Sequence, residues 1–276
     1  MIGRADLDER VREWGLTHRV VEKDYVLGWV LWGIGTEERL ASTWAFKGGT
    51  CLKKCYLETY RFSEDLDFSV LPGGPIAASD LRPTVEALLE RVNAESGIEF
   101  DLSALRLETK PDGRYTEGRI YYRGPLAARQ SGTIRLDITA WEEVVRPTEL
   151  RVISHSYPDT LPMPASVRCY SFVEVFAEMV RFAAANHLCV RLRYQNTTRV
   201  IEPYSLRRTE EGNLLLHAIR VDSRKPRAYR VDRIQGVEVT TQSFTPIYRV
   251  EFSSVGAITA APALRPVRIG YLVDTE

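Results

Sequence analysis

Hydrophobic and polar residues alternate along two short stretches in the first half of the chain. One stretch is DLDFSV at 65–70 and the other is GTIRLDITA at 132–140. A period of two is typical of a strand that buries one face and exposes the other. Both stretches therefore predict half-buried strands, and the polar faces of these strands carry Asp65, Asp67 and Asp137.

Apolar positions at helical spacing indicate that helices accompany these strands. Such patterns cover 6–14, a segment from Thr17 to the glycines at 33 and 35, 79–95, and a segment that begins at Tyr170. Prolines at 158, 162 and 164 mark a linker before the last of these helices. Further strands are expected at 98–109, 118–123 and 149–153.

The periodicity changes after Cys189, where short alternating stretches follow one another. Turn signals such as EGN at 211–213 and RKP at 224–226 separate them. This pattern predicts a small β-barrel or sandwich. Two more strands are expected, at 244–252 and 267–273.

Length and composition set the outline of the molecule. The 276 residues suit one large or two ordinary domains, and we place domains at 1–185 and 186–276. A hydrophobic content of 44% is enough for substantial cores. The chain has no apolar run of about 18 residues and its first residues form no apolar signal core, so we expect a cytoplasmic protein with no membrane segment. The four cysteines complete no zinc pattern, which indicates reduced, buried thiols.

Charge is balanced over the whole chain but not locally. Lys and Arg number 37, as do Asp and Glu, yet residues 186–236 contain eleven basic and five acidic residues. A basic stretch suggests contact with a polyanion or a nucleotide. Solvated strand faces are the alternative interpretation.

A glycine pair, Gly48-Gly49, follows the predicted end of a buried strand at Phe46. Glycine has no Cβ, so a ligand can approach the backbone closely there. We expect Thr50 to cap the helix that follows, whose N-terminus would suit a phosphate. An ordinary strand-to-helix turn is the alternative.

The acidic strand gives a stronger indication of chemistry. Asp65 and Asp67 point the same way, and a bound cation would relieve the repulsion between them. Magnesium prefers oxygen ligands and needs few protein carboxylates beside substrate phosphates. If Asp137 joins them from a neighbouring strand, the three carboxylates could hold two ions for a phosphoryl displacement. The alternative is a solvated strand face with Arg61 or a lysine as counter-ion.

Four segments resemble the AbiEii/AbiGii group of nucleotidyltransferases, the toxins of abortive-infection and type IV toxin–antitoxin systems. They are FKGGT at 46–50, RFSEDLDF at 61–68, EKDYVL at 22–27 and RLDI at 135–138. The resemblance covers residues 10–185 and implies an α+β nucleotidyltransferase fold, a mixed sheet with flanking helices. Lys23 and Asp24, within the third segment, could lie near the active site or on a solvated surface.

The resemblance also implies an activity, the transfer of NMP from an NTP to an RNA such as tRNA, or to a protein, with Mg²⁺ or Mn²⁺ bound. It further implies a cognate antitoxin as partner. Asp65, Asp67 and Asp137 would be the catalytic and metal-binding residues. The triphosphate would contact Lys47, Gly48, Gly49, Thr50, Lys53 and Ser63.

The chain departs from the family pattern near the end of this region. The helix YSFVEVFAEMVR at 170–181 has Met179 where the family has lysine, and the Arg-Asp motif expected downstream is absent. The missing charges bear on acceptor binding and on full activity.

The C-terminal part resembles a WYL domain, an Sm-like β-module that binds nucleic acid or nucleotide-like ligands and regulates an attached domain. The resemblance rests on 190–194, 201–204, 214–218 and 229–234, although Leu-Leu-Leu stands where the family has Trp-Tyr-Leu. Arginine suits phosphate and tyrosine suits base stacking. The candidate ligand-binding residues are Tyr204, His217, Arg220, Arg230 and Arg233.

Two alternatives remain open at the level of the sequence. Arg230 and Arg233 could instead pair with Glu202 and Asp232 inside the fold. The whole protein could also be a regulator with little or no catalytic activity, which senses nucleic acid or a nucleotide through its WYL-like domain.

Overall fold

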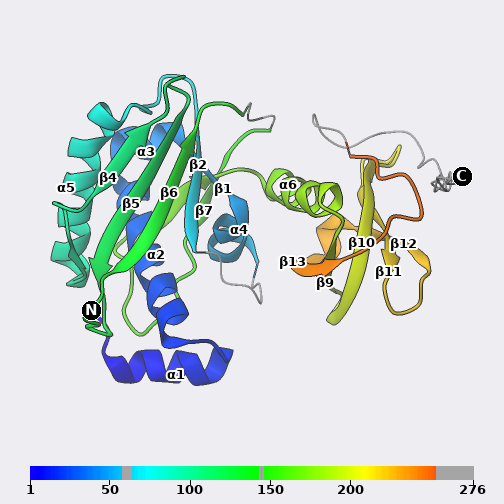
Figure 1. Ribbon diagram of the computed structural model, residues 1–276, viewed down its shortest axis with the longest axis horizontal. Coiled ribbons are helices and arrows are strands. Elements are labelled where there is room, and N and C mark those ends of the chain that lie inside the picture. The colour runs from blue at the N-terminus through cyan, green and yellow to red at the C-terminus, as the bar shows by residue number, and fades with distance from the viewer. Residues whose placement is uncertain (58–63, 143, 145, 253–276) are drawn as a thin grey trace, which may run out of the picture. The chain divides into compact units, whose positions relative to one another are not determined.

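The computed structural model describes residues 1–57, 64–142, 144 and 146–252 (Figure 1). The chain divides into two compact units, Met1–Val175 and Phe176–Glu276, and each is described by itself. The division falls inside helix α6 (Phe172–Ala185), whereas the domain boundary expected at 185/186 falls at the end of that helix. The expected domain limits stay a prediction.

A mixed sheet forms the centre of the first unit. Its strand order is β3-β5-β6-β2-β1-β8-β7, and β4 pairs with β5 off this path. Strand β2 runs parallel to β6 and antiparallel to β1, while β1 runs parallel to β8. The strands are β1 (Trp44–Lys47), β2 (Asp65–Val70), β3 (Glu99–Phe100), β4 (Arg106–Thr109), β5 (Tyr115–Arg123), β6 (Gly132–Thr139), β7 (Glu149–Val152) and β8 (Ser166–Cys169).

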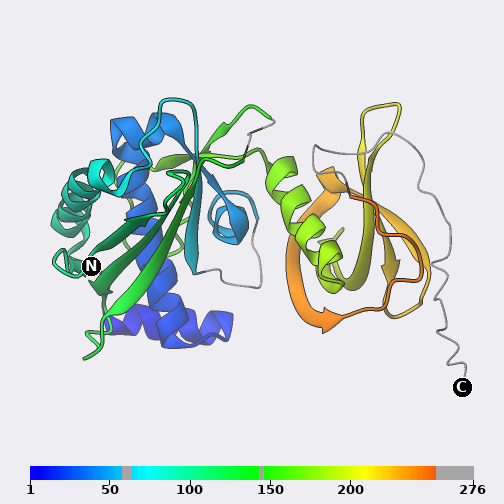
Figure 2. The ribbon, with the colours of Figure 1, turned by 45° about the horizontal axis from the view of Figure 1, so that its top comes forward.

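Helices cover the apolar face of this sheet. The long helix α2 is buried along most of its length and contacts β6, β8 and helix α5. Figures 1 and 2 show α2 behind the sheet, so the polar sides of β2 and β6 are on the face away from it. The helices are α1 (Arg4–Trp14), α2 (His18–Thr36), α3 (Glu38–Thr43), α4 (Gly48–Cys51) and α5 (Ala78–Ser96), and a π-helical turn η1 (Leu52–Tyr56) continues α4.

Several boundaries differ from the sequence predictions. The strand expected at 98–109 is interrupted by a turn and forms β3 and β4. Helix α2 continues past Gly33 and Gly35 to Thr36. A Cβ at position 35 would lie 2.0 Å from the Ser166 carbonyl oxygen. Glycine there permits close packing of α2 against β8, a strand that follows the proline-rich segment and was not predicted.

The second unit combines most of α6 with an antiparallel sheet in the order β12-β11-β10-β9-β13. Within the described residues the edge strands β12 and β13 do not pair, so the sheet is not a closed barrel. A core cluster contains Cys189, Tyr204, Ile219 and Phe244. The strands are β9 (Leu188–Tyr194), β10 (Thr197–Arg208), β11 (Leu214–Arg220), β12 (Pro226–Arg230) and β13 (Ile234–Ser243), and a 3₁₀ turn η2 (Val231–Arg233) precedes β13.

The strand predicted at 244–252 is wrong. That segment has isolated bridge positions at Tyr248 and at Glu251, the latter with Ser205, and no continuous strand. Its apolar residues pack on the core cluster. The strand predicted at 267–273 lies outside the described residues. Among the helices that are described, none has the length and apolarity needed to cross a membrane.

Candidate active site

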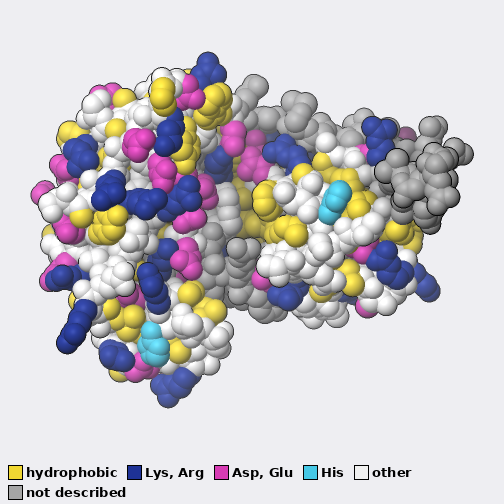
Figure 3. All heavy atoms as spheres, viewed as in Figure 1, with side chains coloured by type: hydrophobic (Ala, Val, Ile, Leu, Met, Phe, Trp, Pro, Cys, Tyr) yellow, Lys and Arg dark blue, Asp and Glu magenta, His cyan; other side chains and the backbone are white. Residues whose placement is uncertain are grey.

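A row of charged residues crosses four adjacent strands of the first unit. Lys47 on β1 is paired in register with Asp67 on β2, Asp67 with Asp137 on β6, and Asp137 with Glu117 on β5. Residues at matching register positions point to the same face of a sheet. On the face of this unit turned to the viewer in Figure 3, basic and acidic side chains lie intermixed. The sequence prediction that Asp67 and Asp137 meet across neighbouring strands is therefore consistent with the register.

The period-two pattern explains why these side chains share one face. Leu66 and Phe68 are fully buried on the other side of β2, as are Leu136 and Ile138 on β6, so the intervening carboxylates must face away from the core. Asp65 lies one repeat before Asp67 and pairs in register with Arg135. Its neighbour on β6 is thus a cation, whereas the neighbour of Asp67 on β6 is a carboxylate.

The three predicted catalytic carboxylates share this face without forming a closed ligand cluster. Their carboxylate oxygens do not all lie within 4.8 Å of one another. Asp137 is held by the Tyr115 hydroxyl at 2.5 Å and by the Arg135 Nε at 3.3 Å. A shared cation would therefore require side-chain rotations that release part of this pairing.

Asp67 is the carboxylate of this row with the raised pKa. Burial raises its pKa to about 6, with Asp137 and Asp65 adding to the rise and Lys47 and Arg135 opposing it. A buried carboxylate beside another carboxylate is stabilised in its charged form by a bound cation. Oxygen donors alone make up this set, which fits Mg²⁺ or Mn²⁺.

The glycine turn lies directly against Asp67. Gly48 has a φ of +75°, which favours glycine, and a Cβ there would lie 2.4 Å from the Asp67 Oδ2. Helix α4 begins at Gly48 with Lys47 as its N-cap residue. The first backbone amides of this helix, including that of Gly49, therefore lie near Asp67, the carboxylate with the raised pKa.

Thr50 has a different role from the one expected. It is the third residue of α4 rather than its cap, and its side chain is buried. Its hydroxyl donates to the Asp65 carbonyl at 2.6 Å, which ties the helix to β2. The predicted capping by Thr50 is wrong because the positive φ of Gly48 lets the helix start earlier.

The remaining predicted phosphate ligands separate in space. Lys47 forms an ion pair with Glu142. Lys53 lies 5.4 Å from the centre of the Trp14 ring and 3.9 Å from Asp24, against helices α1 and α2. Ser63 lies outside the described residues, as does Arg61, the counter-ion of the alternative interpretation.

Sequence reasoning missed several residues of this face. Glu142 also accepts a hydrogen bond from Ser69, and Ser69 accepts one from the Tyr170 hydroxyl at 2.8 Å. Burial raises the pKa of Tyr115 to about 12, so its hydroxyl stays protonated and donates to Asp137. Glu117 and Tyr115 occupy alternate positions of a tyrosine-rich strand, and this alternation was the available signal. Glu142 follows β6 in an irregular segment that carries no such signal.

Asp24 is buried, so it does not lie on a solvated surface. Its Oδ2 accepts hydrogen bonds from Lys54 at 2.8 Å and from the Tyr157 hydroxyl at 3.0 Å. Lys23 instead pairs with Glu64 at 2.8 Å. Asp24 therefore joins α2, η1 and the segment after β7 in a buried polar group.

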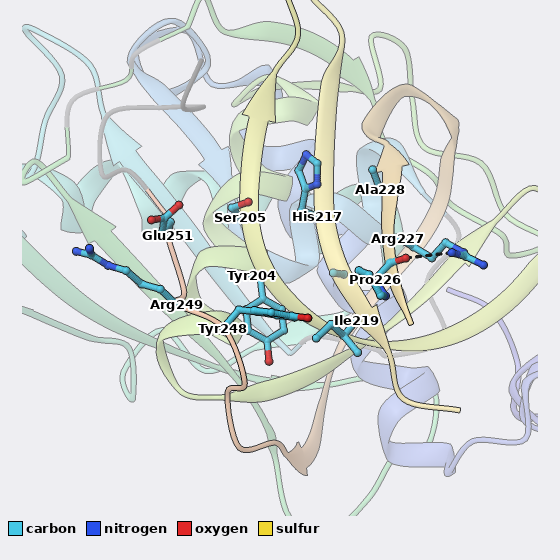
Figure 4. Close-up of a pocket in the computed structure, with 11 residues that line it drawn as sticks. Tyr204, Ser205, His217, Ile219, Pro226, Arg227, Ala228, Tyr248, Arg249 and Glu251 are labelled. Carbon is cyan, nitrogen blue, oxygen red and sulfur yellow. Dashed lines mark hydrogen bonds between the residues drawn. The ribbon is translucent and has the colours of Figure 1, made fainter. Parts of the chain in front are cut away.

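The second unit contains a pocket of about 320 Å³ (Figure 4). Its walls are mainly apolar, and Tyr204 and Tyr248 lie on one side with ring centres 5.9 Å apart. His217, Arg227 and Arg249 provide polar groups. Burial lowers the pKa of His217, so its imidazole is neutral at pH 7.

The structure divides the five candidate WYL-ligand residues into two groups. Tyr204 and His217 line this pocket, whereas the three arginines are not among its lining residues. Arg220 pairs with Asp222, and Arg230 pairs with Asp232 at 2.7 Å. Glu202 pairs with Arg224, so among the described residues the Arg230–Asp232 pair of the alternative interpretation forms, on the surface, and the pair with Glu202 does not.

Two solved structures illustrate how far the chain resembles known proteins, and both are of low similarity. MenT4, a nucleotidyltransferase toxin from Mycobacterium tuberculosis H37Rv, has 24% identity and a TM-score of 0.44, over 67% of this chain and 60% of that one. The proteasome accessory factor B/C (PafBC) of Arthrobacter aurescens has 24% identity and a TM-score of 0.23, over 25% of this chain and 12% of that one. The chain thus matches about 60% of the length of MenT4. No curated protein sequence matches significantly.

Two family models match the chain itself. The WYL domain model matches residues 175–239, which contain β9 to β12 and most of α6. The model described as nucleotidyl transferase AbiEii toxin, type IV TA system, matches residues 30–198, which contain the glycine turn and all three predicted catalytic carboxylates. Because this match covers more than half of the sequence, the chain belongs to the AbiEii nucleotidyl transferase toxin family.

Proposed function

We propose that the protein transfers a nucleoside monophosphate from an NTP to a hydroxyl group of an RNA or a protein. The observation that carries this proposal is the contact between the Gly48 turn and Asp67, in the same charged row as Asp137. The backbone turn, which can bind phosphate, lies next to the carboxylates, which can bind a cation. A reaction at the α-phosphate of a triphosphate needs both.

In this reaction the acceptor oxygen bonds to the α-phosphorus, and the bond from that phosphorus to the pyrophosphate oxygen breaks. The amides at the start of α4 would bind triphosphate oxygens, with Lys47 supplying positive charge. Asp65, Asp67 and Asp137 would hold Mg²⁺ or Mn²⁺, which when bound neutralises charge on the phosphates and lowers the pKa of the acceptor hydroxyl. Asp137 would help to orient that hydroxyl for loss of its proton.

The acceptor and the setting extend the same proposal. We assign the acceptor to RNA, with tRNA as the first candidate, and make a protein side chain the other outcome of the test. Because NTPs and tRNA are found in the cytoplasm, the reaction would take place there. Toxin activity of this kind would serve type IV toxin–antitoxin or abortive-infection phage defence, with an antitoxin as partner.

The test incubates the full chain with Mg²⁺, each α-labelled NTP, total RNA and a protein lysate, and then separates RNA from protein. Label should enter the RNA fraction and disappear from it in Asp67→Asn. Glu90→Gln, on the exposed side of α5, is the matched control and should retain the transfer. Transfer that is equal in Asp67→Asn and the parent chain would contradict the proposed site.

The pocket of the second unit supports a second function, binding of a nucleotide or nucleic acid by the WYL domain. Paired tyrosine rings can stack on a base, and Arg227 and Arg249 can contact phosphate. Binding of labelled mononucleotides and oligonucleotides would be measured by fluorescence anisotropy. Arg249→Ala should weaken it if the pocket is used, and Arg230→Ala and Arg233→Ala should weaken it if the exposed arginines are used instead.

A protein that binds such ligands but transfers no label with any NTP would be a regulator rather than an enzyme. In that case the loss of catalysis would be explained by the charges missing from this chain, since Met179 replaces a lysine and the Arg-Asp motif is absent. Binding and transfer therefore have to be measured on the same preparation.

A further inference from the structure

Two cysteines just after the glycine turn meet a third cysteine from a distant part of the sequence. Cys51 is in α4, Cys55 is in η1, and Cys169 ends β8. Their sulfur atoms all lie within 4.8 Å of one another. All three side chains are buried, and none of them forms a disulfide.

The fold brings these thiols together through two neighbouring elements. Cys169 on β8 pairs in register with Phe46 on β1, and β1 leads directly into the helix that carries the other two cysteines. Residues four apart share one face of a helix, so Cys51 and Cys55 both face β8. The Leu57 amide donates to the Leu52 carbonyl at 2.7 Å, which closes a π-helical turn around Cys55. Such turns are rare and often mark functional sites.

Basic residues accompany the cluster. Lys54, which pairs with Asp24, precedes Cys55 in η1, and Arg151 lies on β7, the strand paired with β8. The Arg151 Nε also donates to the Cys55 carbonyl at 3.3 Å. Positive charge beside a buried sulfur group favours the thiolate form, which is the form that binds metals.

A single buried cysteine is usually a small apolar side chain. Three that converge form a set of soft ligands, which select ions such as Cu⁺ or Zn²⁺ over Mg²⁺. Structural zinc is almost always held by four ligands. Within the described chain no fourth His, Cys, Asp or Glu joins these three, and Cu⁺ accepts three thiolates without a fourth ligand.

We propose that Cys51, Cys55 and Cys169 form a three-thiolate binding site for a thiophilic metal ion, with Cu⁺ as the fitting ion. Binding releases the protons of the thiols to solvent and leaves a negatively charged centre beside Arg151. The bound ion would join β8 to the helix that begins at Gly48. Metal loading would thus restrain the glycine turn from its far side.

The test uses the full chain, fully reduced and kept without oxygen. Cu⁺ is titrated against the competing chelator bicinchoninate, and native mass spectrometry counts the ions in each chain. We expect one ion per chain, three sulfur ligands by X-ray absorption, and at least a tenfold weaker affinity in Cys51→Ala, Cys55→Ala and Cys169→Ala. Cys189→Ala removes a buried cysteine of the second unit and should leave the affinity unchanged.

Several results would overturn the assignment. The first is that the reduced chain binds no Cu⁺. The second is that all three cysteine variants bind it as tightly as the parent chain, and the third is that the chain binds Zn²⁺ more tightly than Cu⁺. Exposure to air can join two of the thiols in a disulfide, which mass spectrometry detects as a loss of two mass units. If the oxidised chain still binds Cu⁺, the ion is bound elsewhere. If the variants fail to fold, the number of sulfur ligands in the unaltered protein decides, because fewer than three contradicts the site.

Discussion

Asp67 is the residue at which the stability of the fold and the proposed chemistry oppose each other. Its pKa is raised to about 6 from 3.8, first by burial and then by Asp137. Between these two values the folded chain binds more protons than the unfolded chain, so the free energy of unfolding decreases as pH rises through that window. Above pH 6 the charged Asp67 carboxylate lowers the free energy of unfolding of the metal-free protein by a constant amount.

Asp67→Asn should therefore stabilise the metal-free protein at pH 7.5. Removal of the charge is expected to add on the order of 1–3 kcal/mol to the free energy of unfolding. Thermal melts in the presence of a chelator measure this effect, and Glu90→Gln should show no change. Added Mg²⁺ should stabilise the parent chain but not the variant. A lower melting temperature for metal-free Asp67→Asn would contradict the pKa argument.

The same residue sets a pH dependence for nucleotide transfer. At low concentrations of Mg²⁺ the rate should fall as pH decreases through about 6, because Asp67 becomes protonated and no longer binds the ion. Higher Mg²⁺ should move the fall to lower pH. Initial rates from pH 5 to 8 at several Mg²⁺ concentrations would show this shift. A profile that does not move with Mg²⁺ would mean that another group titrates.

Gly48 offers a test of the close approach between the turn and Asp67. Gly48→Ala combines an unfavourable φ with a Cβ that meets the carboxylate, and should lower transfer about tenfold or more. Gly113→Ala is the matched control, since its φ of +69° imposes similar strain while nothing lies within 4 Å of the added Cβ. Both should lose about 1–3 kcal/mol of stability. Equal losses of activity would show that strain, rather than contact with Asp67, matters.

At the scale of elements, the buried group around Asp24 fixes α2 against η1. Both Asp24 and Lys54 are almost fully buried, and loss of either partner leaves an uncompensated charge. Asp24→Ala should cost about 3–5 kcal/mol of unfolding free energy, measured by urea denaturation. The double variant Asp24→Leu with Lys54→Met should recover much of that loss. A double variant no more stable than Asp24→Ala would show that packing, and not the unpaired lysine, causes the effect.

The central strands were predictable because their signal is local. The alternation of apolar and polar residues defines β2 and β6 and places Asp67 and Asp137 on their polar faces. Which strands pair depends on contacts between distant parts of the sequence, and a local pattern does not contain that information. Thus the sequence did not reveal that Glu117 joins the row or that Cys169 meets Cys51. Strand β8 was missed because it follows a proline-rich segment. Residues 244–252 have strand-like alternation, yet they pack on the core of the second unit mostly without forming a ladder.

At the scale of the whole molecule, the position of α6 decides where the chain can be divided. Phe176, Val180, Ala183 and Ala184 are buried residues of this helix and belong to the second unit. A fragment of residues 176–276 should therefore fold, whereas 186–276, the domain expected from the sequence, should be largely unfolded. Circular dichroism and amide NMR spectra of both fragments would measure this. A well-folded 186–276 fragment would support the later boundary.

The charged row lies on central strands of a sheet rather than on a mobile lid. Amide hydrogens of such strands exchange mostly when a whole cooperative unit opens. If the chain acts as the proposed toxin, local melting of this row would require the central sheet to open as a unit. An antitoxin would then have to obstruct the charged face, compete for the NTP or alter a side chain covalently, and activity should return in full once that obstruction is lifted.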